Sequence, residues 1–321
     1  MGRGPLFQSD YKPVFSGHET FPLRYGWLKK AYDAVAADNR SAGNRKIFRD
    51  DDAIARFGVG KNMVASMRHW AMSVGVIQDN PVFFDSIMTT EVGDFLFGPD
   101  GVDPYLESPA SLWHIHWLLC NGLQEHFKTT WFWIFSHFSG NQFTREELVQ
   151  GLTRLIPSCG LPSVSATTLK RDVECFVRTY EFNPSPRGTM EEVLESPLAE
   201  LRLLQGIKGT YHLVRGPKPS LPSGVFTVAL NDFWVKHGST RTLSFEMIAH
   251  EPASPGRVFL LDEVDLSERL LALADVTNIF EWSETAGLKQ VIRNRELTVE
   301  DRWRLLKADY EGANVLREVA P

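Results

Sequence analysis

The stretch DDDAIARFGVGKNMVASMRHWAMSVGVI, residues 50–77, contains the clearest structural signals in the N-terminal part of this 321-residue chain. Its three aspartates precede a short apolar segment, where acidic side chains complement the positive end of a helix dipole. Gly58 and Gly60 predict a tight turn between two helices. Apolar residues then recur every three or four positions over residues 61–74, which predicts a longer helix. Gly75 ends that helix and leads toward a strand.

A short helix, a glycine turn, a longer helix and a strand are the outline of a winged helix-turn-helix. The second helix exposes residue types that contact phosphates and base edges in DNA. These candidates for DNA contact are Lys61, Asn62, Arg68 and His69, preceded by Arg45, Lys46 and Arg49 as candidates for holding phosphates. Because such three-helix units also serve as protein-interaction modules, a partner protein is the alternative ligand.

The charge of the chain is unevenly distributed. Its net charge is -6, yet residues 1–78 carry 12 Lys and Arg against 7 Asp and Glu, and the remaining residues carry 22 against 33. A basic N-terminal part on an acidic protein fits local contact with a polyanion such as DNA. The acidic remainder suits either solubility or a protein interface.

The rest of the sequence predicts a mainly α-helical protein with short β hairpins, built from winged helix-turn-helix units. A first helix is expected to begin near Pro22, and the capping box Thr144-x-x-Glu147 opens another. Further helices are expected over residues 112–119, 131–138, 166–180, 198–204, 226–237, 243–249 and 263–276. Strand pairs are expected over residues 208–215 and 279–293. Polar residues on the outer face of the 166–180 helix predict a second DNA-contacting surface, formed by Thr167, Thr168, Lys170 and Arg171.

Two breaks divide the sequence into three expected parts. Residues 1–100 form an N-terminal winged-helix DNA-binding part, and residues 101–183 form a middle helical part with a second helix-turn-helix. Residues 184–321 form a C-terminal α/β part that is winged-helix-like. The Asn-Pro-Ser-Pro-Arg-Gly run at residues 183–188 is the clearest boundary, because proline and glycine interrupt both helices and strands.

Several functional classes find no support in the residues. There is no P-loop, Gly-x-Ser-x-Gly, His-Glu-x-x-His, EF-hand or PD-(D/E)xK pattern. His114 and His116 have helical neighbours, and since positions i and i+2 on a helix point apart, core or surface histidines are favoured over a metal site. The N-terminus lacks a signal peptide, and the apolar region 112–138 is interrupted by polar and charged residues. We therefore expect a cytoplasmic protein with no membrane partner and no small-molecule substrate.

The run FSGHETFPLR, residues 15–24, places His18, Glu19 and Arg24 just before the first expected helix. These residue types perform acid–base catalysis and contact phosphates. The alternative is a capping segment with Thr20 as the N-cap and Pro22 in the first turn. On chemistry alone the capping interpretation is the stronger one.

Three runs together resemble the SspB-like family of bacterial proteins. They are FSGHETFPLRYGWLKK at residues 15–30, GVGKNMV at residues 58–64, and residues 101–119 with DPYL at 103–106. The resemblance extends over about residues 15–300. It implies a DNA-nicking component of the Ssp system, which places phosphorothioate linkages in one DNA strand in anti-phage defence. It also implies Mg²⁺ as a divalent metal, and a cysteine desulfurase and an ATP-dependent sulfur-transfer enzyme as partners.

The resemblance brings no assigned catalytic residues or metal ligands with it. Because the first run is the most concentrated part of the resemblance, His18, Glu19 and Arg24 are the catalytic candidates. The leading hypothesis is a DNA-binding protein that nicks one strand for phosphorothioate modification. The alternative is a non-catalytic winged-helix adaptor or transcriptional regulator that binds DNA and recruits partner proteins.

Overall fold

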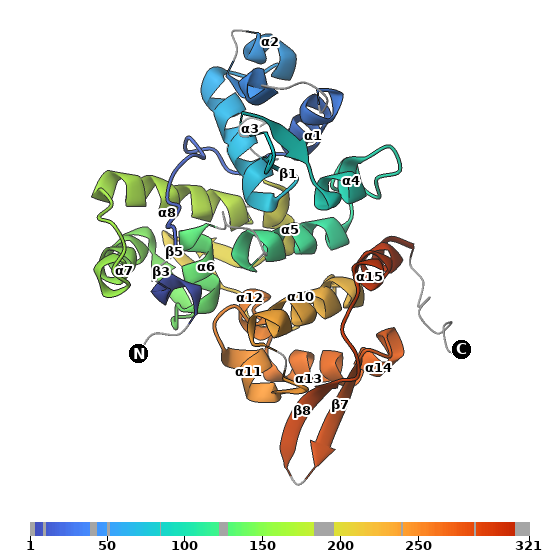
Figure 1. Ribbon diagram of the computed structural model, residues 1–321. Helices are drawn as coiled ribbons and strands as arrows, with labels where there is room; N and C mark the ends of the chain where they lie inside the picture. The colour runs from blue at the N-terminus through green and yellow to red at the C-terminus, as the bar shows by residue number, and fades with distance from the viewer. Residues whose placement is uncertain are drawn as a thin grey trace. The chain divides into compact units, whose positions relative to one another are not determined.

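The chain is mostly helical, as the computed structural model shows for residues 4–8, 11–38, 44–49, 52–83, 85–121, 128–182, 196–238, 240–285 and 287–311. Within these residues the strands form three small antiparallel sheets, ordered β1-β2, β3-β5-β4 and β6-β8-β7 (Figure 1). The expected helical protein with short β hairpins is confirmed at this level. None of the described helices has the length and apolar character needed to cross a membrane.

Two compact units make up the chain, and each is assembled from separate segments. Unit 1 comprises Met1–Glu107, Gln124–Trp131 and Gly140–Leu213. Unit 2 comprises Ser108–Leu123, Phe132–Ser139 and Val214–Pro321. The three expected parts, in contrast, are consecutive in the sequence; they stay a prediction, and their boundary at residues 183–188 lies outside the described residues.

Unit 1 contains most of the elements expected from the opening stretch. Its helices are η1 (Pro5–Phe7), α1 (Trp27–Ala37), η2 (Asn44–Phe48), α2 (Ala53–Phe57), α3 (Lys61–Val74), α4 (Glu91–Phe97), α7 (Arg145–Ser158), α8 (Ala166–Tyr180) and η3 (Pro197–Leu201). Its strands are β1 (Ile77–Asp79), β2 (Ile87–Thr89), β3 (Gln142–Thr144), β4 (Leu204–Ile207) and β5 (Thr210–Leu213). The predicted order of short helix, turn, longer helix and strand is confirmed, and so are the bounds of α3 and α8.

Local signals explain why these helices end where they do. Gly58 and Gly75 close α2 and α3 in the left-handed conformation, with φ of 66° and 76°, which a residue without a Cβ adopts at little cost. Thr144 and Glu147 form the predicted capping box at the start of α7. The buried side of α3 includes Trp70, which is fully enclosed in the core of unit 1.

The first helix begins later than predicted, at Trp27. The Phe21 N–H donates to the His18 carbonyl at 2.8 Å, and Glu19 and Thr20 between them have φ of 47° and 68°. Two central residues with positive φ are typical of a type I′ turn. Thr20 is therefore part of a turn and not an N-cap, so the capping interpretation of this segment is wrong in its detail.

Unit 2 contains the C-terminal elements. Its helices are α5 (Pro109–Asn121), the greater part of α6 (Thr129–Ser136), α10 (Ser223–Lys236), α11 (Phe245–His250), α12 (Pro255–Val258), α13 (Glu263–Leu271), α14 (Leu273–Val276) and α15 (Val299–Glu311). Its strands are β6 (Thr242–Ser244), β7 (Phe280–Thr285) and β8 (Leu288–Arg293). The hairpin at residues 279–293 is confirmed. The expected helix at 243–249 is instead a short strand followed by α11, because Ser244 caps the helix by accepting from the Met247 N–H.

Candidate functional site

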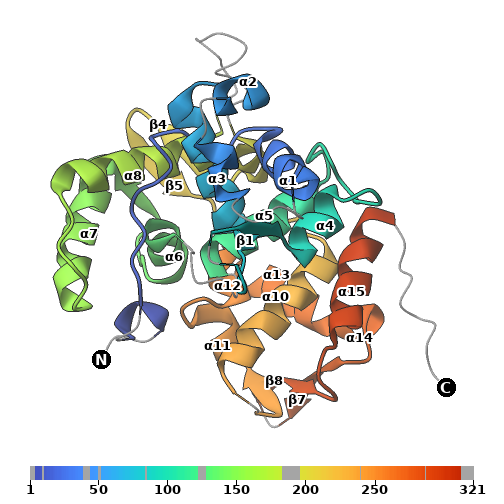
Figure 2. The ribbon, with the colours of Figure 1, turned by 45° about the horizontal axis from the view of Figure 1, so that its top comes forward.

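The segment before α1 is fixed to the body of unit 1 at both ends. Figure 2 shows this N-terminal segment, drawn in dark blue, running alongside α8. The Val14 N–H donates to the Thr129 hydroxyl at 2.8 Å, and the Trp70 indole donates to the Phe21 carbonyl at 3.0 Å. The turn at residues 18–21 is held between these two anchors.

Asp172 of α8 gathers three groups from distant parts of the sequence. Its side chain is 0% exposed. One carboxylate oxygen, Oδ1, accepts from His18 Nε2 at 3.0 Å and lies 3.9 Å from Lys128 Nζ. The other, Oδ2, accepts from the Thr130 hydroxyl at 2.5 Å. A buried carboxylate requires partners of this kind. Here they connect the N-terminal segment at residues 15–24 to α8 and to the start of α6.

His18 uses both ring nitrogens within the protein. Its Nδ1 accepts the Thr20 N–H at 3.0 Å, so the proton resides on Nε2 and is donated to Asp172. His18 therefore fixes the turn, and Glu19 is exposed beside it. Glu19 and Thr20 both adopt a positive φ, and such strained backbone in residues other than glycine is concentrated at functional sites.

Lys128 is a second buried charged residue, 0% exposed. Its Nζ lies 5.3 Å from the ring centroid of Trp70 and 4.9 Å from that of Trp131. The same Nζ is 2.8 Å from His69 Nε2. Burial lowers the pKa of the Lys128 ammonium, and the neighbouring Asp172 carboxylate opposes that shift.

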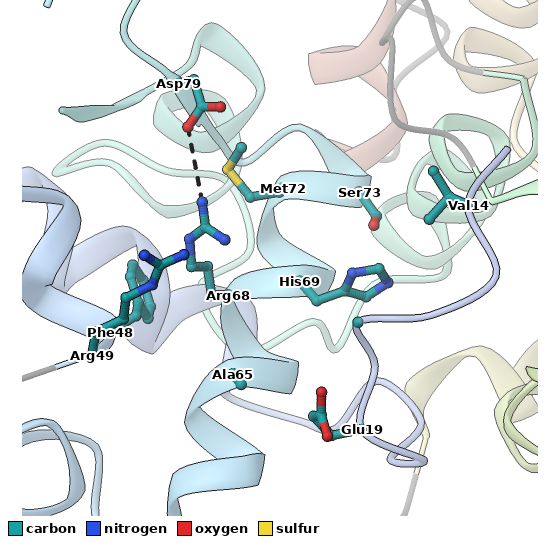
Figure 3. Close-up of a pocket in the computed structure, with 11 residues that line it drawn as sticks. Val14, Glu19, Phe48, Arg49, Ala65, Arg68, His69, Met72, Ser73 and Asp79 are labelled. Atoms are coloured by element: carbon teal, nitrogen blue, oxygen red, sulfur yellow. Dashed lines mark ion pairs between the residues drawn. The ribbon is translucent and has the colours of Figure 1, made fainter. Parts of the chain in front are cut away.

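Two cavities in unit 1 share Gly17 and Glu19. The first has a volume of about 390 Å³ and lies against α3 (Figure 3), with Arg49, Arg68 and His69 in its lining. The second has a volume of about 310 Å³, and Asn62, Thr168 and Arg171 contribute to its lining together with His18. In the first cavity Arg68 forms an ion pair with Asp79 at 3.9 Å.

The structure thus brings together many of the residues that the sequence singled out. Those that line the two cavities are His18, Glu19, Arg49, Asn62, Arg68, His69, Thr168 and Arg171. Lys46, Lys61, Thr167 and Lys170 are exposed on η2, α3 and α8. The Arg24 guanidinium lies over the rings of Phe21 and Trp27, 5.5 Å and 5.7 Å from their centroids. The side chain of Arg45 lies outside the described part of the structure.

Lys128, Thr130 and Asp172 are not among the candidate residues predicted from the sequence. A signal for two of them was present. Asp172 stands on the inward face of α8, between Leu169 and Phe176, and Lys128 interrupts the most apolar region of the chain. Lysine and aspartate are almost never fully buried without partners. A charged residue on an apolar face therefore indicates a buried position where other side chains pair with the charge.

Few of the described side chains around the two cavities could coordinate a metal ion. Across the described ranges, no group of three His, Cys, Asp or Glu side chains could hold a metal ion. The Asp172 oxygens are engaged by His18, Thr130 and Lys128. With Asp79 paired to Arg68, Glu19 is the remaining carboxylate in the lining of the two cavities. These residues do not form a magnesium site by themselves.

Comparisons with known proteins place the chain in a family. Residues 15–310 match the family described as "Protein of unknown function (DUF4007)". No curated protein matches the chain. A crystal structure of SspB is similar with a TM-score of 0.81 and 28% identity, covering 96% of this chain and 91% of that one. A crystal structure of magnesium ion-bound SspB is similar with a TM-score of 0.80 and 27% identity, covering 97% and 92%. The chain therefore belongs to the DUF4007 family and is SspB-like, as the three runs of sequence predicted.

Proposed function

We propose that this chain is a component of a DNA phosphorothioation system, and that it binds DNA at the two cavities and nicks one strand. One observation carries the proposal: polar residues from the N-terminal turn, α3 and α8 converge on cavities that share Gly17 and Glu19. The similarity to SspB supports the phosphorothioation context.

DNA would be held mainly by guanidinium groups. Arg49 and Arg68 line the first cavity and Arg171 lines the second, and arginine suits bidentate contact with phosphate oxygens. The 3.9 Å pair of Arg68 with Asp79 is partly exposed, so it is weak enough for a phosphate to replace the carboxylate. We place α2, α3 and the β1–β2 hairpin in the roles of a winged helix-turn-helix, with Lys61 and Asn62 at the exposed start of α3 directed to the DNA.

Glu19 is the residue we assign to contact with the reacting phosphodiester. Its carboxylate is exposed on the strained turn and lines both cavities. His18 acts as a positioning residue, because its ring is engaged by Asp172 on one side and by the turn on the other. Magnesium, which one of the similar SspB structures binds, is part of the proposal as a requirement of nicking, with no ligands assigned.

Supercoiled plasmid is the substrate that tests this function. Wild-type protein is incubated with Mg²⁺, with Mn²⁺ or with EDTA, beside Glu19→Gln and the control Glu146→Gln, which changes an exposed glutamate in the first turn of α7. We expect open circles from wild type and Glu146→Gln with metal, and a loss of at least about 100-fold in Glu19→Gln. Equal nicking by both variants would remove Glu19 from the site.

Binding is tested separately by fluorescence anisotropy of a labelled duplex at several salt concentrations. Arg171→Gln is compared with Arg154→Gln, which replaces an exposed arginine of α7 that lines neither cavity. Loss of one phosphate contact reduces the slope of log K against log salt by about one. We expect this reduction in Arg171→Gln alone; the same slope in both variants would contradict a DNA contact in the second cavity.

A non-catalytic adaptor is the second candidate function. It is favoured by the engagement of both His18 nitrogens and both Asp172 oxygens inside the protein, which suits a structural role. An adaptor would shift plasmid on a gel without opening it. In either role we propose a cytoplasmic protein with a cysteine desulfurase and an ATP-dependent sulfur-transfer enzyme as partners, which co-purification with tagged protein would test.

A further inference from the structure

We propose that His69 donates a proton to the deoxyribose oxygen that leaves phosphorus during nicking, and that the buried Lys128 resupplies it. The inference rests on the nicking function proposed above and assigns it a proton donor. Neither residue was placed in a proton-transfer role by the sequence.

The His69 imidazole joins a buried charge to a cavity. Its Nε2 is 2.8 Å from Lys128 Nζ. Its Nδ1 lies against Gly17, so close that a Cβ added to Gly17 would come within 2.5 Å of it. His69 and Gly17 both line the first cavity (Figure 3). One ring nitrogen therefore meets the lysine, and the other lies against Gly17, a residue of the cavity lining.

The protonation state follows from the donors available. A lysine ammonium can only donate, so a charged Lys128 requires an unprotonated Nε2 and places the His69 proton on Nδ1. Burial lowers the pKa of Lys128, which makes its proton easier to transfer. The ring of His18 stands 6.1 Å from that of His69. Among the described residues, the titratable and charged groups that line the cavity or lie behind the ring include Lys128, His18, Glu19, Asp172, Cys175, Arg68, Arg49 and Asp79.

The step balances in protons and bonds. As the oxygen of a water molecule bonds to phosphorus, the bond from phosphorus to the deoxyribose oxygen breaks, and that oxygen takes the proton from Nδ1. The Lys128 ammonium gives a proton to Nε2, so the ring ends as the other neutral tautomer and the lysine ends neutral. The attacking water gives its proton to the Glu19 carboxylate. Solvent then restores the original protonation through His69.

A DNA duplex with sulfur in place of the leaving deoxyribose oxygen tests directly whether His69 is the proton donor. A thiolate leaves without a proton, so a duplex carrying sulfur in place of that oxygen needs no proton donor. We expect His69→Gln and Lys128→Met to cleave normal DNA at least about 100-fold and 10-fold more slowly than wild type, and to cleave the sulfur duplex within about threefold of wild type. Glu19→Gln is the control whose defect sulfur does not restore. A defect of His69→Gln that persists on the sulfur duplex would overturn the proposal.

Two further measurements test the proton relay, which is the transfer of a proton from Lys128 through His69. They distinguish it from effects on folding and from nicking itself. Lys128→Arg retains the positive charge but does not release a proton near neutral pH, so it should be as slow as Lys128→Met on normal DNA. Nitrogen NMR of wild-type protein without DNA should report the Nδ1–H tautomer of His69; the Nε2–H tautomer would overturn the relay whether or not the protein nicks. Wild type that cleaves neither duplex would refute the nicking function and the donor role together, and the tautomer would still report the Lys128–His69 arrangement.

Discussion

Replacement of Gly17 by alanine tests the contact that links the N-terminal turn to His69. Gly17 has a φ of 100°, and an added Cβ would lie 2.5 Å from Nδ1 and 3.1 Å from Cε1 of the His69 ring. A Cβ essentially never lies within about 3.0 Å of another heavy atom, so the His69 ring has to move. Because the opposite edge of the ring bonds to Lys128, the movement breaks the hydrogen bond of that buried side chain.

The expected loss of stability has two parts. The left-handed backbone costs an L-residue about 1–2 kcal/mol. Leaving the buried Lys128 ammonium without its 2.8 Å partner costs about 1–3 kcal/mol more. The free energy of unfolding should therefore fall by about 2–5 kcal/mol in Gly17→Ala. Gly209→Ala is the matched control, because Gly209 has a φ of 85° with no atom within 4 Å of an added Cβ, so it should lose only the backbone part.

Urea unfolding followed by tryptophan fluorescence measures both variants. His69→Ala added to Gly17→Ala gives a double-mutant cycle that cancels the backbone strain. We expect a coupling of about 1–3 kcal/mol, because removal of the ring relieves the overlap. Equal losses in Gly17→Ala and Gly209→Ala, together with zero coupling to His69, would show that the contact between Gly17 and His69 does not contribute to stability.

Three other predictions concern pH, capping and DNA contact. Burial lowers the pKa of His114 to about 3 and of His116 to about 4. As the pH falls, these histidines are therefore protonated in the unfolded chain before they are protonated in the folded protein. Their stabilising contribution is complete above the ordinary pKa of about 6.5, and the free energy of unfolding should fall by about 1 kcal/mol per histidine as the pH falls from about 8 to about 5.5; urea midpoints that stay constant over that range would contradict this. Thr144→Ala removes the capping box of α7 and should cost about 1 kcal/mol, measured by the same unfolding assay, whereas Thr153→Ala within the same helix is the comparison. Lys61→Ala, at the exposed start of α3, should lower the salt slope of DNA binding by about one, and an unchanged slope would place Lys61 outside the interface.

Most of the helices of this chain and its hairpin at residues 279–293 could be predicted because their signals are local. Gly58 and Gly75 end α2 and α3 through their own backbone freedom, and the capping box of α7 needs only residues 144 to 147. The resemblance to the SspB-like family also rests on short runs of sequence. The late start of α1 escaped prediction, because the turn at residues 18–21 is stabilised by contacts outside the segment, including the bond from His18 to Asp172.

Most of the helical elements, the basic N-terminal part and a set of candidate residues could be predicted from the amino-acid sequence alone. Which residues contact one another depends on the folded structure. His18 and Asp172 are 154 positions apart, and His69 and Lys128 are 59 apart. A pairing over such a distance depends on how whole elements pack, since the buried charges of Asp172 and Lys128 are stable only where the fold brings partners to them. Periodicity along one segment carries no information about that packing, so the partners of Lys128 could not be predicted from the sequence.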